Sequence, residues 1–114
     1  MCLIKIHRFP KISSKPITVY KVLIPLNRIF ITPCQSCKVY IGDTIKARKA
    51  WWKGVFKEGI EGEGVHAYVS IDNAKENIYG NDVIAEVEIP PYTPYWIGKA
   101  GDMAASKMKI IKLL

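Results

Sequence analysis

Apolar and polar positions alternate most clearly in two stretches of the second half of the chain. In residues 65–71, VHAYVSI, every second side chain is apolar. Residues 82–91, DVIAEVEIPP, repeat the pattern with Glu86 and Glu88 on the polar side, and end at two prolines that cannot donate to a sheet ladder. A period of two is typical of strands with one buried face, so both stretches predict β-strands.

A short helix is predicted between these two strands, in residues 73–79, NAKENIY. Asp72 is placed to cap its first turn, and Gly80 to end it in a left-handed conformation. Earlier in the chain, β-branched and aromatic residues fill 17–24, ITVYKVLI, between two prolines, which predicts a central strand that is apolar on both faces. The other β-type runs of the first half are shorter and occupy residues 28–32 and 38–45.

The last quarter of the chain combines turn signals with a closing strand. Residues 101–107, GDMAASK, predict a turn or a helical turn, and residues 108–114, MKIIKLL, predict the final strand. Its lysines, Lys107, Lys109 and Lys112, do not share one face of a regular strand. Many strands and little helix predict a single α+β domain over residues 1–114, with a mostly antiparallel, strongly bent sheet and one or two short helices.

Charge is unevenly distributed over the 114 residues, whose net charge is +7. Residues 1–57 contain twelve lysines and arginines and one acid, Asp43, whereas residues 58–88 contain eight acids and one lysine, Lys75. We expect partial neutralisation where strands pair, with a basic patch left over. Because no apolar run is long enough to span a membrane, we expect a cytoplasmic protein without a membrane partner.

The most basic stretch, residues 46–57, KARKAWWKGVFK, surrounds two adjacent tryptophans. Its apolar positions fit an amphipathic helix, although two adjacent tryptophans suit a strand almost as well. Lysines that contact phosphate and aromatic rings that stack on bases are the usual components of a nucleic-acid surface. In the alternative interpretation, at least one tryptophan belongs to the core and the lysines cover it. The candidate nucleic-acid-binding residues are Lys46, Arg48, Lys49, Trp51, Trp52, Lys53 and Lys57.

Two cysteines, Cys34 and Cys37, have the C-x-x-C spacing of half a zinc site. Cys2 with His7 or His66 would complete four ligands, but no second closely spaced pair follows. A redox pair would need to begin a helix, and the residues after Cys37 look like a strand. The remaining interpretation is two thiols in a turn, and we expect no cofactor.

A possible pocket is formed by the polar side of the strand at residues 65–71, where His66, Tyr68 and Ser70 follow one another. A catalytic base there would need a nucleophile or a carboxylate within about 3 Å, so a hydrogen-bonded structural histidine is the simpler interpretation. Glu86 and Glu88 lie about 7 Å apart by strand rise, which is wider than a retaining carboxylate pair. They are better interpreted as a solvated or lysine-paired face.

Three segments, GVHAYVSIDNA, VIAEVEIPPYTPYWIG and GDMAASKMKII, resemble a group of small uncharacterised bacterial and phage proteins. That group shares a Gly-x-His-Ala-aromatic strand, a strand ending in Ile-Pro and a Gly-Asp-x-Ala-Ser turn. The resemblance covers most of the chain outside residues 25–60, and it implies a fold but no mechanism.

A more distant likeness, in chain order alone, is to ADP-ribosyltransferase-type domains. Those domains have a histidine or arginine on an early strand, where this chain offers Tyr20 and Lys21. They usually have a late catalytic glutamate, whereas no glutamate follows Glu88 here. No catalytic residue is therefore carried over to this sequence.

Three functional hypotheses follow from the sequence. The first is a small non-enzymatic binding or interaction module, whose basic N-terminal half contacts a protein partner or a second copy of the chain. The second is a nucleic-acid-binding protein that uses the basic stretch at residues 46–57. The third is a nucleotide-acting enzyme with a transferase-like fold, centred on His66 and Tyr68.

Overall fold

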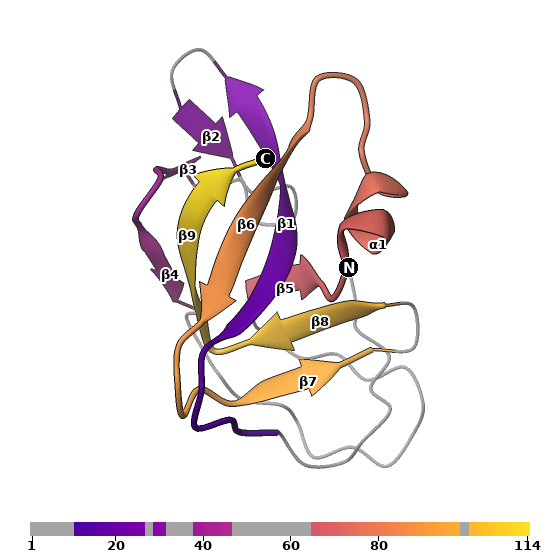
Figure 1. Cartoon of the computed structure of the whole chain (residues 1–114). Helices are drawn as coiled ribbons and strands as arrows, with labels where there is room; N and C mark the ends of the chain where they lie inside the picture. Colours follow the sequence, from indigo (N-terminus) through magenta and orange to yellow (C-terminus); the bar gives the residue numbers. More distant parts are fainter. Residues whose placement is uncertain (1–10, 27–28, 32–37, 47–64, 99–100) are drawn as a thin grey trace.

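The computed structural model describes residues 11–26, 29–31, 38–46, 65–98 and 101–114. In these ranges one sheet contains nine strands, with the order β4-β9-β6-β1-β5-β8-β7 and with β2 and β3 attached to β1 (Figure 1). The elements are β1 (Ile17–Leu26), β2 (Ile29–Ile31), β3 (Lys38–Val39), β4 (Thr44–Lys46), β5 (Val65–Tyr68), α1 (Ile71–Lys75), β6 (Val83–Ile89), β7 (Tyr95–Ile97), β8 (Asp102–Ala105) and β9 (Lys107–Leu113).

The sheet bends around one main core. Figure 1 shows β7 and β8 running across the direction of β1, β6 and β9, so that strands from both halves of the sheet enclose a common interior. Alternate residues of each strand face this interior, as the period of two predicts. The core is formed mainly by side chains of β1, β5, β6, β8 and β9: Val19, Leu23, Val65, Ala67, Ala85, Val87, Ile89, Met103, Ala105, Met108 and Ile110.

The helix α1 lies on the outer face of the sheet. Its buried residue Ala74 forms a smaller cluster with Val22 of β1 and Ile84 of β6. The helix begins two residues earlier than predicted, because Ser70 rather than Asp72 is its N-cap. The Ser70 hydroxyl accepts a hydrogen bond from the Asn73 amide at 3.1 Å, while Asp72 lies in the first turn, where its charge favours the helix dipole.

The helix also ends earlier than predicted, at Lys75, so Gly80 does not terminate it. Gly80 does have a positive φ, 56°, but it lies in a separate turn in which the Asp82 amide donates to the Tyr79 carbonyl. The left-handed conformation was therefore predicted correctly and its role was not.

The segment GDMAASK was predicted as a turn, and it is instead strand β8. Asp102–Ala105 pairs with β5 on one side and β7 on the other. Ala104 and Ala105 are fully buried between these neighbours, where larger side chains would not fit. Gly101, with φ 78°, and Ser106 lie at bends on either side of this strand.

A β-bulge in β9 changes which lysines share a face. Glu88 pairs with Lys109 and Glu86 with Lys112, so the pairing skips one residue between them, Ile111. Side chains of directly opposed residues in an antiparallel pair point to the same side of the sheet. Because the bulge adds one residue to β9, Lys112 points to the same side as Lys109 although three positions separate them. Lys109 and Lys112 therefore lie on the same outer face as Lys107, which corrects the expectation from a regular strand.

The prediction of a mostly antiparallel sheet is confirmed, since every strand pairing in the described ranges is antiparallel. Helix is a minor component there, with α1 as its one α-helix. The radius of gyration is 13.3 Å, as expected for a compact chain of this length. Within the described part of the chain, none of the helical structure is long and apolar enough to cross a membrane.

Candidate anion-binding site

Two lysines of β9 face carboxylates across the sheet. Lys109 lies opposite Glu88 and Lys112 lies opposite Glu86, both on β6. Opposite charges in directly opposed positions stabilise a sheet, whereas like charges destabilise it. The interpretation of Glu86 and Glu88 as a lysine-paired face agrees with this register.

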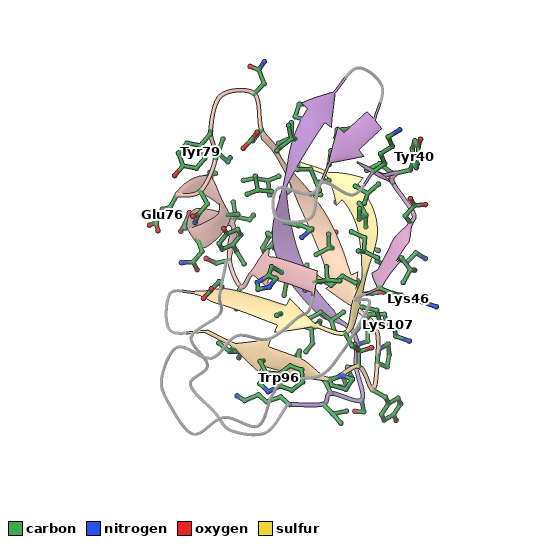
Figure 2. The ribbon with its side chains drawn as sticks, turned by 180° about the vertical axis from the view of Figure 1, so that it is seen from behind. Tyr40, Lys46, Glu76, Tyr79, Trp96 and Lys107 are labelled. Carbon is green, nitrogen blue, oxygen red and sulfur yellow. The ribbon has the colours of Figure 1, made fainter. Side chains whose placement is uncertain are left out.

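A third lysine of β9, Lys107, is in a different environment. Its partner on β4 is Lys46, and β6 has already ended at Ile89, so the strand on the other side provides no carboxylate opposite it. Figure 2 shows the two lysines close together at one edge of the sheet. Directly opposed residues have Cα atoms about 4.5–5.5 Å apart, and like charges in such positions destabilise a sheet, a cost that a bound anion would reduce.

Further cationic residues reach the same end of the molecule through backbone hydrogen bonds. The Ser106 amide donates to the Pro94 carbonyl at 3.1 Å, which attaches the turn between β6 and β7 to the start of β9. The Tyr92 amide donates to the Ser13 carbonyl at 2.7 Å, which attaches the segment before β1 to the same turn. Figure 1 shows the ends of β4 and β6 and the starts of β1 and β9 together at the lower left.

We call Lys11, Lys15, Lys46 and Lys107 the basic end. Lys11, Lys15 and Lys46 are exposed and Lys107 is half-buried. The backbone of Lys11 is bridged to Tyr95 by two hydrogen bonds of 2.8 and 3.0 Å, which holds this segment along the edge of β7. The basic end thus combines lysines from three separate parts of the chain.

The turn that connects these segments carries an exposed aromatic ring. Tyr92 is 72% exposed and has φ 61°, which makes it the one non-glycine residue with a positive φ in the described ranges. The next residue, Thr93, is only 2% exposed. Tyr92 is therefore the projecting tip of a turn that is anchored immediately behind it.

Of the predicted nucleic-acid-binding residues, the structure describes Lys46, the last residue of β4. The other six lie outside the described residues: Arg48, Lys49, Trp51, Trp52, Lys53 and Lys57. Sequence reasoning did not find Lys11, Lys15, Lys107 or Tyr92, because they join Lys46 only through strand register and turn contacts. The spacing of Lys107 and Lys109 by two residues was the one available signal, since it places both on one strand face.

The predicted pocket residues do not form one polar row. His66 and Tyr68 share the outer face of β5, but Ser70 lies beyond the end of that strand. The Ser70 hydroxyl caps α1 and donates to the Asn73 side-chain oxygen at 2.5 Å. Its hydrogen-bonding capacity is used in holding the helix start.

The imidazole of His66 is kept neutral. Burial, together with the positive charge of Lys21, lowers the pKa of His66 from 6.5 to about 4, although the Asp102 carboxylate acts in the opposite direction. Lys21 is only 7% exposed, and its ammonium donates to the His66 carbonyl at 2.5 Å. A base with this pKa is poorly matched to proton abstraction at neutral pH, which agrees with the structural interpretation of His66.

The proposed cysteine ligands, Cys34 and Cys37, lie outside the described residues, as do Cys2 and His7. Among the residues that the structure does describe, no three histidine, cysteine, aspartate or glutamate side chains are grouped so that they could hold a metal ion.

Comparison of the chain with known protein families, with curated proteins and with solved structures gives no match. The resemblance to small phage and bacterial proteins remains a prediction from the sequence. A functional interpretation therefore has to come from the surface chemistry of the chain itself.

Proposed function

We propose that this protein is a small non-enzymatic binding module that holds an anionic partner at its basic end. The observation that carries the proposal is the register of β9. It places Glu88 and Glu86 opposite Lys109 and Lys112, and it places Lys107 opposite another lysine, Lys46. In the described part of the chain, no side-chain hydrogen bond or ion pair is formed by Lys46 or Lys107, nor by Lys109 or Lys112, so the two pairs of lysines differ in the charge that the register places opposite them.

An anion bound between these two lysines relieves a repulsion that the folded chain otherwise retains. Electrostatic gain on binding is largest where cations are not already neutralised within the protein. Among the described strands, the register places no carboxylate opposite Lys46 or Lys107, whereas the glutamates opposite Lys109 and Lys112 reduce the attraction of those lysines for an external anion. The proposal thus concerns one end of the sheet and does not follow from the net charge of +7 alone.

The enzymatic alternative, a nucleotide-acting enzyme centred on His66 and Tyr68, has weaker support. Ser70 is engaged as a helix cap, and the lowered pKa of His66 makes its imidazole a weak base. Nucleic-acid binding, by contrast, is one form of the proposed function, because Lys46 is also the first residue of the basic and tryptophan-containing stretch at 46–57.

The test compares two double variants with the same change in net charge. Lys46→Ala with Lys107→Ala removes the opposed lysines, and Lys109→Ala with Lys112→Ala removes the glutamate-paired lysines. Binding is measured by fluorescence anisotropy with labelled single-stranded DNA, duplex DNA and a poly-glutamate peptide. We expect the first variant to lose about tenfold or more in affinity for the preferred probe, and the second to lose less than threefold.

Stability provides an independent readout in the same two variants. Removing the opposed lysines should leave the melting temperature unchanged or raise it, since it removes repulsion. Removing Lys109 and Lys112 should lower the melting temperature, because Glu88 and Glu86 lose their cross-strand partners. Equal loss of affinity in the two variants would show that net charge alone drives binding, and would contradict the proposed site.

A further inference from the structure

The conformation of Tyr92 is unusual for its side chain. A positive φ brings the Cβ atom close to the backbone, so the region is favoured by glycine and, among other residues, by asparagine. Tyr92 adopts φ 61° between Pro91 and the buried Thr93. Either glycine or asparagine would form this turn with less strain than tyrosine.

The fold gains little from the ring of Tyr92 in return. The side chain is 72% exposed, so most of its surface gives no burial energy within the described structure. The backbone beside the ring is nevertheless held firmly. The Tyr92 amide donates to Ser13, Pro91 precedes it, and Pro94 accepts from Ser106 two residues later. The ring is thus presented outward by a rigid turn, which lowers the entropy lost when a ligand binds to it.

Two backbone hydrogen bonds connect the turn that carries this ring to segments that contain lysines. Through the first bond, the carbonyl of Pro94, two residues after Tyr92, accepts from the Ser106 amide, and Lys107 follows Ser106. This path limits the distance between the Cα atoms of Tyr92 and Lys107 to at most about 16 Å. Through the second bond, the Ser13 carbonyl accepts from the Tyr92 amide, and Lys15 follows Ser13 by two residues. An exposed ring on a turn that is hydrogen-bonded to two lysine-bearing segments suits a strand that carries a base between successive phosphates.

We infer that Tyr92 is a stacking platform for a base of single-stranded nucleic acid, whose flanking phosphates are held by Lys15 on one side and by Lys46 with Lys107 on the other. This inference rests on the proposed function, since it specifies the anion that the basic end binds. A duplex keeps its base faces stacked inside the helix and does not offer them to a projecting ring. An acidic peptide supplies charge but no flat π-face, so it would leave Tyr92 unused.

The experiment uses the whole chain and a fluorescein-labelled oligothymidylate of about twelve nucleotides, with a duplex and a poly-glutamate peptide of similar length as competitors. Tyr92→Asn removes the ring and suits the left-handed backbone, so it should fold with an unchanged or higher melting temperature. Tyr92→Phe keeps a ring for stacking. Tyr79→Ala is the matched control, because Tyr79 is 77% exposed and lies by α1, far from Lys46 and Lys107 in Figure 2.

We expect the oligothymidylate to bind more tightly than the duplex or the peptide. Tyr92→Asn should weaken it about tenfold, Tyr92→Phe less than threefold, and Tyr79→Ala not at all. Unchanged affinity in Tyr92→Asn, or preferential binding of the poly-glutamate peptide, would overturn the inference. If Tyr92→Asn has no effect but Lys46→Ala with Lys107→Ala abolishes binding, the proposed function stands and the stacking inference fails. Absence of binding to all three probes would defeat both.

Discussion

His66 is held neutral by burial and by the charge of Lys21, and this has a consequence for stability. The folded pKa is about 4, whereas the unfolded value is 6.5, so the unfolded chain binds more protons between these two pH values. The contribution of the neutral imidazole to stability is complete above pH 6.5 and is lost as the pH falls towards 4. The difference corresponds to at most about 3 kcal/mol.

This prediction is checked with urea denaturation of the wild type and of His66→Gln at several pH values from 7 to 4. The free energy of unfolding should fall more steeply with acid in the wild type than in the variant, whose side chain does not titrate. All other titrating groups are common to both proteins, so the difference between the two curves isolates His66. Parallel curves would mean that the folded protein does not suppress protonation of His66.

A second residue whose role the structure defines is Gly101. Its φ is 78°, and a Cβ atom at this position would lie 2.4 Å from the side-chain nitrogen of Asn73. Asn73 has little freedom to move away, because its side-chain oxygen accepts from Ser70. Gly101→Ala should therefore lower the free energy of unfolding by about 3 kcal/mol, which combines backbone strain with overpacking.

Gly80→Ala is the matched control for this substitution. Gly80 also has a positive φ, 56°, but a Cβ atom there would meet nothing within 4 Å. The control should cost only the backbone term, about 1 kcal/mol. Equal losses in the two variants, measured by thermal or urea unfolding, would show that Asn73 gives way and that its contact with Gly101 is unimportant.

Among the elements, β9 makes the most specific prediction. Deleting Ile111 removes the extra residue of the bulge and leaves a regular strand, in which Lys112 still faces Glu86 and Leu113 still faces Ala85. Deleting Lys112 shortens the same strand by one residue but destroys this pattern, since an apolar residue then lies opposite Glu86. We expect the first deletion to cost about 1 kcal/mol and the second at least about 2 kcal/mol.

Circular dichroism and urea denaturation of the two deletion variants check this prediction. Because Ile110 and Ile111 are identical, deletion of either gives the same chain, and the result does not depend on which is removed. A larger loss on deleting Ile111 than on deleting Lys112 would mean that the twist introduced by the bulge matters more than the alternation of side chains.

The sequence predicted the strands whose pattern is local. Residues 65–71 and 82–91 alternate with a period of two, and they contain β5 and β6, although β5 ends earlier because Ser70 is taken as a helix cap. β8 was missed because its residues are buried by the strands on both sides, β5 and β7. Its sequence, DMAA, shows no alternation of apolar and polar residues that would predict a strand. The bulge in β9 was missed for a similar reason, since it is defined only by the partner strand.

The candidate site was less predictable than the fold. Lys46 was identified from its place in a basic stretch, but what distinguishes it in the structure is Lys107, which is sixty-one positions further along the chain (107 minus 46) and directly opposite in the sheet. Tyr92 has no signal in the sequence beyond its neighbouring prolines. Such contacts follow from register and from turn anchoring, neither of which a single sequence determines.

For the whole molecule, the expectation of partial neutralisation with a basic remainder agrees with the strand pairing, but the partners differ from those expected. The acids of β6 meet lysines of the C-terminal strand β9 rather than cations of the basic first half. Among the described cations of the first half, Lys11, Lys15 and Lys46 belong to the basic end.

The measurement that tests the central claim most directly is a backbone amide NMR titration of the whole chain with the single-stranded oligothymidylate at moderate salt. Chemical-shift changes should concentrate in residues 11–15, 44–46, 92–93 and 106–107, which contain the basic end and Tyr92, and should fade as salt rises. Amides around Lys112 and α1 should change little. Changes spread evenly over all lysine-bearing strands, or centred on His66 and α1, would contradict a binding site at the basic end.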